Sequence, residues 1–407
     1  MSRRGLLKAA GGLAAAGAAG AAGTAAFGGG NATAAPATFT HPGMLHNAGD
    51  INRARVRVRE GTDPWLSGWN RLTANPHSAS TWAPRPLAEV YRGSGWEQNY
   101  PVLYNDIAAA YQNALRYQVS GSTAHGDCAR DILNAWSSTL RVLNGSADRF
   151  LLAGLQGWQF ANAAELMRGY PGFELGRFQD MMVNVFYPLN NQFLTEHNGA
   201  CITNYWANWD LCNMASVLAI GILCDDGPLY DQAVTYFTSG EGNGSIQHAV
   251  PFLHPNVDGH DLGQWQESGR DQGHTVMGMG QMGAFCEMAW NQGEDLYGYD
   301  DARFFKAAQY VAKYNLGQDV PFTRYTWGTG QSCAYSEHTV ISSASRGQVR
   351  PVWALIHFHY NRRRYWDDPH IRDMYYGLVA PEGGGGDYGS TSGGYDQLGF
   401  GTLMYAK

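Results

Sequence analysis

Hydrophobic residues recur three and four positions apart along most of this chain, which is the spacing of helices that bury one face. Between residues 104 and 117, for example, Ile107, Tyr111, Ala114 and Leu115 fall on one side of a helix. Another helix is expected to begin within the basic segment 53–59. The same spacing predicts helices at 65–72, 128–143, 151–168, 173–193, 206–224, 229–237, 273–291, 302–315 and 349–363.

Most predicted helices are ten to twenty residues long, and short breaks containing Gly or Pro separate them. Consecutive helices with such short connections pack as antiparallel hairpins. Ten or more of them, with neither a coiled-coil heptad nor a fixed-period repeat, predict an all-α single domain built as an incomplete (α/α) toroid.

Two segments depart from the helical pattern. Strand-like runs are few and short, such as Thr339–Ser342. The Pro-, Trp- and Gly-rich segment Asn75–Gln98 is longer than a simple connector and is expected to be a loop. Its aromatic residues Trp82, Tyr91 and Trp96 either line a cleft or pack against the body.

The first 34 residues have the composition of an export signal. Arg3 and Arg4 form a twin-arginine pattern, and an Ala/Gly-rich apolar stretch follows, with small residues before Ala35 that suit cleavage. A membrane anchor is the alternative, but this stretch is weakly hydrophobic and no later one has ~20 uninterrupted apolar residues. We therefore expect residues 1–34 to be a twin-arginine signal peptide and residues 35–407 to form a secreted domain without a membrane span.

The chain is acidic and rich in aromatic residues. Its formal charge of -7 becomes -10 when the signal peptide takes away three cations and no acid. Nucleic-acid binding needs a basic surface, so nucleic acid is not an expected partner. An anionic ligand would need a locally positive site. The 13 Trp and 23 Tyr residues suit stacking on sugar rings as well as core packing.

Six cysteines are present, an even number that would permit disulfides in an exported protein. Twin-arginine substrates fold before export in a reducing compartment, and the chain has no C-x-x-C pair. We therefore expect buried thiols and no metal motif at Cys128, Cys201, Cys212, Cys224, Cys286 and Cys333.

Charged and amide side chains crowd the segment Gln264–His274, directly before a helix made mostly of Gly, Met, Ala and Phe. Burying such groups without partners costs about 1–3 kcal/mol each, which favours a polar pocket. Arg270 and His274, four residues apart, would share a helix face. The guanidinium can bind a carboxylate and hold the imidazole neutral, as proton abstraction beside a carboxylate requires. The alternatives are a solvated loop or a structural ion pair of Arg270 with Glu267 or Asp271.

Amides also lie beside aromatic residues at the start of the predicted helix 206–224. Asn204 and Asn208 are four residues apart, and Tyr205 and Trp209 share the neighbouring face. Amides beside Trp are typical of carbohydrate sites, whereas an N-cap Asn with packed aromatics is the structural alternative.

Further candidates lie later in the chain. Arg324 and Tyr325 follow the predicted helix 302–315, and a Tyr can act as an acid or base where a cation stabilises its phenolate. Arg350 adds another cation. The chain contains no H-E-x-x-H, G-x-S-x-G, Walker or Rossmann motif.

At these residues the chain resembles the alginate-lyase superfamily of bacterial polysaccharide lyases. The run Tyr205-Trp206-Ala207-Asn208-Trp209 resembles the Tyr-Trp-Ala-Ala-Trp of periplasmic alginate lyases. The resemblance covers roughly residues 41–360 and is nearest to the branch that includes polysaccharide lyase family 38, with its glucuronan and alginate lyases. Three other similar segments are His41–Gly43, Ala289–Gly293 and Ala312–Asn315.

The resemblance implies an incomplete α/α toroid and β-elimination on a 1,4-linked uronate polymer, an anionic polysaccharide, without a metal or cofactor. In such lyases an Asn or Arg neutralises the substrate carboxylate, a His or Tyr removes the C5 proton, and a Tyr protonates the leaving oxygen. The expected catalytic residues here are Asn208, Arg270, His274 and Tyr325, with Tyr205 and Tyr335 as alternatives for the Tyr. The expected substrate-binding residues are Asn204, Tyr205, Trp206, Trp209, Gln264, Glu267, Arg324 and Arg350.

The chain departs from the periplasmic pattern at two places. Ile202 and Thr203 stand where those lyases have Asn-His, and Met277 stands where a catalytic Tyr follows the Arg by seven residues. Two other functions therefore stay open. A non-catalytic glycan-binding protein on the same scaffold is one. A glycoside hydrolase on an α/α toroid is the other, and its two facing carboxylates would come from Glu165, Asp210, Glu267, Asp271 and Glu337.

Overall fold

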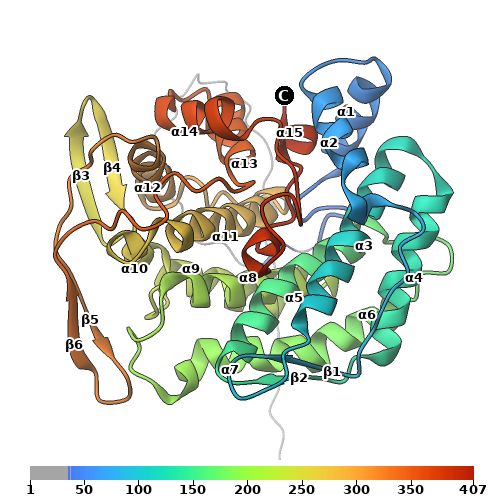
Figure 1. The fold of residues 1–407 in the computed structure, drawn as a ribbon, viewed down its shortest axis with the longest axis horizontal. Helices are drawn as coiled ribbons and strands as arrows, with labels where there is room; N and C mark the ends of the chain where they lie inside the picture. The colour runs from blue at the N-terminus through green and yellow to red at the C-terminus, as the bar shows by residue number, and fades with distance from the viewer. Residues whose placement is uncertain (1–34, 37) are drawn as a thin grey trace, which may run out of the picture.

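The computed structural model describes residues 35, 36 and 38–407, so the predicted signal peptide lies outside the described residues. Helices dominate these residues, as the hydrophobic spacing predicts (Figure 1). They are α1 Ala48–Arg59, α2 Trp65–Ala74, α3 Tyr100–Ser120, α4 Thr123–Thr139, α5 Asp148–Leu166, α6 Leu175–Met181, α7 Tyr187–Glu196, α8 Ala207–Leu223, α9 Gly227–Ser239, α10 Ile246–Ala249, α11 Gln272–Asn291, α12 Tyr299–Asn315, α13 Trp353–His357, α14 Pro369–Met374 and α15 Gly401–Tyr405.

The middle of the molecule is formed by α5, α8 and α11 (Figure 1). Every residue of α8 except Trp209 is buried, and α5 packs closely along it. Glycines permit this approach, because a side chain at Gly154 or Gly157 of α5 would collide with Cys212 or Ser216 of α8. Helices α3 and α4 cover one side of this centre, and α8 pairs with α9 as a hairpin.

Two predicted helices are divided in the structure. The predicted helix 173–193 consists of α6 and α7, which a π-helical turn at Met182–Phe186 separates. The predicted helix 349–363 is regular only over α13 and continues as a π-helical turn at Phe358–Arg363. The apolar C-terminal segment docks on the body, with Leu403 and Met404 of α15 fully buried.

Among the described residues, six short strands form three two-stranded sheets. The β1–β2 pair is parallel, whereas β3–β4 and β5–β6 are antiparallel hairpins. Their bounds are β1 Glu89–Arg92, β2 Val142–Gly145, β3 Phe252–Val257, β4 His260–Gln264, β5 Tyr325–Thr329 and β6 Ala334–His338.

The predicted strand at Thr339–Ser342 is wrong, and the strands lie immediately before it. Residues 325–329 pair with 334–338, so that the hairpin is complete at His338. The chain then leaves the sheet, and the Ser342 N–H donates to the Ser268 carbonyl instead. The predicted loop 75–98 is likewise interrupted by β1, which takes its partner β2 from beyond α4.

The prediction of six thiols is wrong for two residues. Cys201 and Cys333 form a disulfide although 132 positions separate them, while Cys128, Cys212, Cys224 and Cys286 are free. The bond joins the loop before α8 to the turn of the β5–β6 hairpin. Local sequence spacing does not reveal such a pair, because only the folded hairpin brings the two cysteines together. No helix among the described residues is both long and apolar enough to cross a membrane.

Candidate active site

The segment Gln264–His274 connects β4 to α11 and packs against the start of α8. Residues 266–269 form a 3-10 turn, and Asp271 caps α11 by accepting the His274 N–H at 2.8 Å. A capping Asp fixes the direction in which a helix starts. As a result, Arg270 and His274 lie side by side as predicted, with Arg270 Nη2 3.3 Å from His274 Nε2.

Arg270 forms the ion pair that the sequence left as its structural alternative. Its guanidinium lies 2.8 Å from Glu267 Oε2 and 3.6 Å from Asp271 Oδ2. It also lies over the Trp206 ring, 5.1 Å from the ring centre. The Glu267 side chain is fully buried, whereas 26% of the Arg270 side chain is exposed. The buried Glu267 carboxylate therefore holds one side of the Arg270 guanidinium, while part of the side chain stays exposed to solvent.

The His274 imidazole is oriented by a carboxylate. Its Nδ1 lies 2.7 Å from Asp271 Oδ2, and its side chain is 42% exposed. Burial opposes ionisation of Asp271, but hydrogen bonds from the His274 side chain and backbone, with the charge of Arg270, lower its pKa to about 2. Because Arg270 can only donate, this network assigns the proton to Nδ1 and a lone pair to Nε2. An exposed, unprotonated nitrogen backed by a carboxylate suits a general base.

Asn208 lies beneath this pair and does not reach the surface. Its Nδ2 donates to both Glu267 oxygens at 2.9 and 3.1 Å, and its backbone N–H donates to Oε1 at 2.9 Å. Asn208 is 2% exposed, and Glu267 is fully buried. Asn208 thus fixes Glu267, and Glu267 in turn pairs with Arg270. Direct contact of either residue with substrate stays a prediction.

Gln264 and Asn204 hold the β5–β6 segment rather than project outward. The Gln264 side chain is buried, donates to the Thr323 carbonyl at 2.8 Å and accepts its N–H at 2.6 Å. The Asn204 side-chain oxygen Oδ1 accepts the Gly330 N–H at 2.6 Å. Both polar atoms of Gln264 are thus occupied in the interior, and its contact with substrate stays a prediction.

The two other aromatic candidates before and within α8 belong to a packing cluster. The Tyr205 and Trp209 rings lie 4.6 Å apart, and Phe193 lies 5.1 and 5.8 Å from them. The Tyr205 hydroxyl accepts from the Asn198 amide at 2.9 Å. Both residues are partly exposed, and their ring contacts give them a packing role.

Tyr325 lies on the first strand of the hairpin and points inward. It is 8% exposed, its hydroxyl accepts from Gln266 Nε2 at 2.9 Å, and it lies 3.3 Å from Asn243 Oδ1. Burial raises its pKa to about 12, so the phenol keeps its proton at neutral pH. The alternative Tyr335 is largely exposed and hydrogen-bonds to Arg324 and Glu337.

His338 is a residue of this site that sequence reasoning missed. It is the cross-strand partner of Tyr325, and its ring stacks parallel to Trp206 with centres 5.7 Å apart. The Trp327 ring lies 4.7 Å from it. Burial and the charge of Arg270 lower the pKa of His338, and its buried Nδ1 has no hydrogen-bond partner. Its pairing with Tyr325 across the hairpin could have identified His338. The strand was predicted at Thr339–Ser342, however, which begins just after His338.

The remaining two predicted arginines lie outside this group. Arg324 is exposed on the hairpin and forms an ion pair with Glu337. Arg350 is buried beside the C-terminal segment, where it pairs with Asp396 at 2.9 Å and donates to the Gly393 carbonyl at 3.0 Å.

The structure thus brings together Trp206, Arg270, His274, Tyr325 and His338, and we call these five residues the Arg270 cluster. Across the part of the chain that is described, no three His, Cys, Asp or Glu side chains are grouped as metal ligands.

Comparison with known proteins places the chain in a family. The family model for alginate lyase matches residues 93–321, and no curated protein sequence matches the chain. Among solved structures, a variant of alginate lyase A1-III complexed with a tetrasaccharide is similar with a TM-score of 0.57, 16% identity and coverage of 91% of this chain and 97% of that one.

Two further structures agree with this result. Alginate lyase A1-III from Sphingomonas species A1 has a TM-score of 0.54 and 15% identity, covering 91% of this chain and 98% of its own. An alginate lyase from Bacteroides ovatus has a TM-score of 0.55 and 12% identity, covering 90% of this chain and 100% of its own. These likenesses confirm the predicted fold, a mostly helical single domain of the α/α-toroid type. Because the family model also spans more than half of the chain, the protein belongs to the alginate lyase family of polysaccharide lyases.

Proposed function

We propose that the protein is an exported lyase that cleaves a 1,4-linked uronate polymer, glucuronan or alginate, by β-elimination without a metal ion. The observation that carries the proposal is the contact between Arg270 and the exposed His274, whose Nε2 faces the guanidinium at 3.3 Å. This pair supplies a cation for a carboxylate and a base for the proton next to it. We also propose the branch that includes polysaccharide lyase family 38, on the resemblance of residues 41–360.

In the proposed reaction the substrate carboxylate binds the exposed side of Arg270, which stabilises the charge that develops as C5 loses its proton. His274 Nε2 takes that proton, and Asp271 stabilises the resulting imidazolium. The electron pair forms the C4–C5 double bond while the bond from C4 to the glycosidic oxygen breaks. Tyr325 is assigned to protonate that oxygen because its phenol retains its proton at neutral pH. The proton on His274 then returns to solvent and the phenol is reprotonated.

A screen of purified protein tests the proposal directly. With alginate, glucuronan, polygalacturonate and glycosaminoglycans offered separately, one uronate polymer is expected to give rising ultraviolet absorbance from the unsaturated product. The rise should persist in the presence of a chelator. Release of reducing ends from neutral glycans without that rise would identify a hydrolase. Binding of a polymer without any product would identify a glycan-binding protein.

Export is proposed from Arg3 and Arg4, which form the twin-arginine pattern. Replacing both by Lys keeps the charge and removes the pattern. The variant is expected to accumulate inside the cell, while the unchanged chain appears outside it, as measured by immunoblotting of cell and medium fractions. Equal secretion of both would overturn export by this route.

A further inference from the structure

Asp231, in the second turn of α9, is a half-buried carboxylate without a cation. No Arg, Lys or His side chain among the described residues forms an ion pair with it. Its Oδ1 accepts the backbone N–H of Ala35 at 2.5 Å, across 196 positions of the sequence. A partly buried carboxylate normally has a counter-charge, because water no longer solvates it fully. The charge of Asp231 is therefore unbalanced in the chain as it is translated.

The acids next to Asp231 already have other partners. At the turn before α9, Asp225 pairs with His41 at 2.9 Å and with Arg168 at 3.8 Å. Asp226 caps the helix through its side chain. Together the three aspartates make the N-terminal end of α9 locally negative, and a cation beside Asp231 would be attracted there.

The segment before α1 reaches α9 along a fixed path. The Gln292 side chain, at the end of α11, accepts the Thr40 N–H at 2.9 Å and donates to its carbonyl at 3.1 Å. Phe39 packs edge-on against Tyr230 of α9, with ring centres 5.6 Å apart. Ala35 itself packs against the hydrophobic core. The backbone of Ala35 is thus held against α9 by contacts that begin at Ala35 and continue after it in the chain.

Ala35 is also the first residue after the predicted cleavage site. Hydrolysis by a signal peptidase breaks the Ala34–Ala35 peptide bond, and water supplies a hydroxyl to the Ala34 carbonyl carbon and a hydrogen to the Ala35 nitrogen. The new carboxylic acid loses its proton, and the new amine, with an ordinary pKa of about 7.7–8.0, gains one at neutral pH. A neutral N–H donor is thereby replaced by an ammonium group, whose charge-assisted hydrogen bonds are about twice as strong.

We propose that Asp231 is the binding site of the N-terminus that this cleavage creates. Once residues 1–34 are removed, the Ala35 ammonium forms an ion pair with the Asp231 carboxylate and holds the segment before α1 on α9. This inference rests on the proposed export. Because twin-arginine substrates fold before export, the domain is already folded when the bond is cut, and processing then adds stability outside the cell.

A double-mutant cycle tests the ion pair. The hydrophobic core described above lies within residues 35–407, so a chain that begins at Ala35 can be released from a fusion without export. A second chain begins at Ala34, and each is made with Asp231 and with Asp231→Asn, which keeps an acceptor oxygen but no charge. The Ala35 chain is expected to melt about 1–2 °C above the Ala34 chain, and Asp231→Asn should abolish the difference.

Acetylation of the amine provides a readout that stability alone does not change. Acetic anhydride reacts with the unprotonated amine, so an ion pair that stabilises the ammonium slows the reaction. At pH 7 the N-terminus of the Ala35 chain is expected to react roughly tenfold more slowly than that of its Asp231→Asn variant, as measured by mass spectrometry of the N-terminal peptide. Asp180→Asn, at an exposed aspartate of α6, is the matched control and should react like the wild type.

Equal acetylation rates for Asp231 and Asp231→Asn would overturn the ion pair, as would equal melting temperatures for the two N-termini. N-terminal sequencing of the secreted protein checks the cleavage, and a first residue other than Ala35 would overturn the proposal. Failure of the proposed export is a separate result. It appears as equal secretion of the chain with Arg3 and Arg4 replaced, and it leaves the acetylation rates of the recombinant chains unchanged.

Discussion

At the scale of single residues, His274 combines exposure with a fixed orientation. Its side chain is 42% exposed, and Asp271 holds both its backbone N–H and its Nδ1. His274→Ala removes the base but leaves the cap of α11 intact, because Asp271 still accepts the N–H of residue 274. We expect kcat to fall by about 10²–10⁴, as loss of a general base does, with an unchanged melting temperature. Initial rates of unsaturated product formation and circular dichroism melts measure the two effects.

The variant His338→Ala tests whether His338 on the hairpin, and not His274, is the general base. His338 stacks on Trp206 but has no carboxylate to orient it among its described contacts. A fall in kcat equal to that of His274→Ala would move the base to the hairpin. A fall in melting temperature for His274→Ala alone would favour a structural role for the Arg270 network.

Arg270 also contributes to stability, through the ion pair with Glu267 that the sequence offered as the structural alternative. Arg270→Ala leaves the fully buried Glu267 carboxylate without its cation, and breaking such a pair costs about 3–5 kcal/mol. Arg270→Ala is therefore expected to lose both turnover and stability. The double variant Arg270→Ala/Glu267→Gln removes the stranded charge, and it should regain most of the stability but none of the turnover. Urea denaturation and rate measurements separate the effects, and recovered turnover would contradict a catalytic Arg270.

At the scale of secondary-structure elements, the β5–β6 hairpin brings Tyr325, Trp327 and His338 to the Arg270 cluster. Backbone and side-chain hydrogen bonds dock it on the loop before α8, where Thr203 bonds both the N–H and the carbonyl of Gly328 at 2.9 and 3.0 Å. The Cys201–Cys333 disulfide covalently fixes the same contact. The hairpin is thus a positioning element whose attachment should affect catalysis more than the helical core does.

Loss of this disulfide is expected to reduce activity. In Cys201→Ser the hairpin keeps its hydrogen bonds but moves more freely, and displacement of about 1 Å at a reacting group can cost 10²-fold in rate. We expect kcat to fall at least tenfold, and the free energy of unfolding to fall by about 2–4 kcal/mol. Cys224→Ser, which changes a free, half-buried thiol, is the control and should behave like the wild type. Unchanged kinetics after reduction would show that the hydrogen bonds alone suffice.

The elements also show which features a single sequence can predict. The helices were predictable because their periodicity is local, as in Ile107 and Tyr111 of α3. The contact of Arg270 with His274 was predictable for the same reason, since four residues separate them. The burial of Asn208 and the position of His338 were not, because they depend on partners that lie 59 residues away or on the pairing of two strands. Long-range contacts decide which polar atoms remain accessible.

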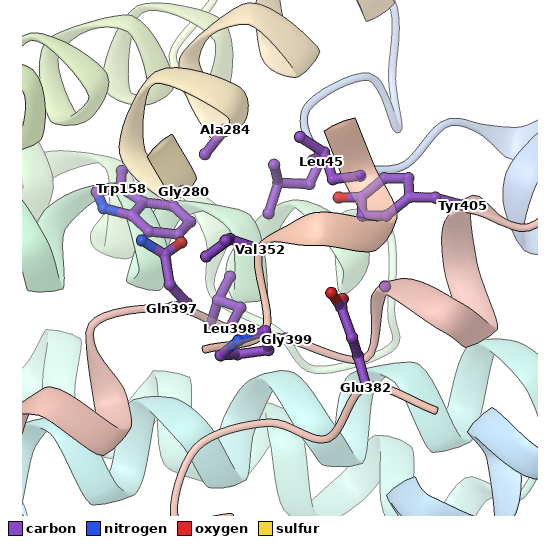
Figure 2. Close-up of a pocket in the computed structure, with 13 residues that line it drawn as sticks. Leu45, Trp158, Gly280, Ala284, Val352, Glu382, Gln397, Leu398, Gly399 and Tyr405 are labelled. Atoms are coloured by element: carbon purple, nitrogen blue, oxygen red, sulfur yellow. The ribbon is translucent and has the colours of Figure 1, made fainter. Parts of the chain in front are cut away.

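At the scale of the whole molecule, the two ends of the domain meet around a buried carboxyl. Glu382 lies at the wall of a small cavity of about 30 Å³, which Leu45 and Tyr405 also line. Figure 2 shows these side chains converging on the pocket. Glu382 Oε1 accepts the N–H groups of Trp353 and Ala354 at 2.8 Å each, so this one side chain joins the C-terminal segment to α13.

This carboxyl should make the stability of the molecule depend on pH. Burial raises the pKa of Glu382 from 4.5 to about 7, although the N–H groups of Ala354, Trp353 and Gly401 oppose the increase. Between those values the folded protein keeps a proton that the unfolded chain has released, so the free energy of unfolding falls as pH rises. The contribution is complete below pH 4.5 and is lost above about pH 7. At about 1.4 kcal/mol per pKa unit it amounts to ~3 kcal/mol.

Glu382→Gln tests this dependence because the amide keeps an oxygen that can accept the two N–H groups and carries no charge at any pH. We expect the stability of the variant relative to the wild type to increase by ~3 kcal/mol between pH 4.5 and pH 8. Urea denaturation at several pH values measures the difference, and Glu97→Gln, an exposed glutamate, is the control. A difference that stays constant with pH would mean that the carboxyl is ionised in the fold, with its backbone donors outweighing burial. The ends of the domain would then be joined by a charge and not by a neutral acid.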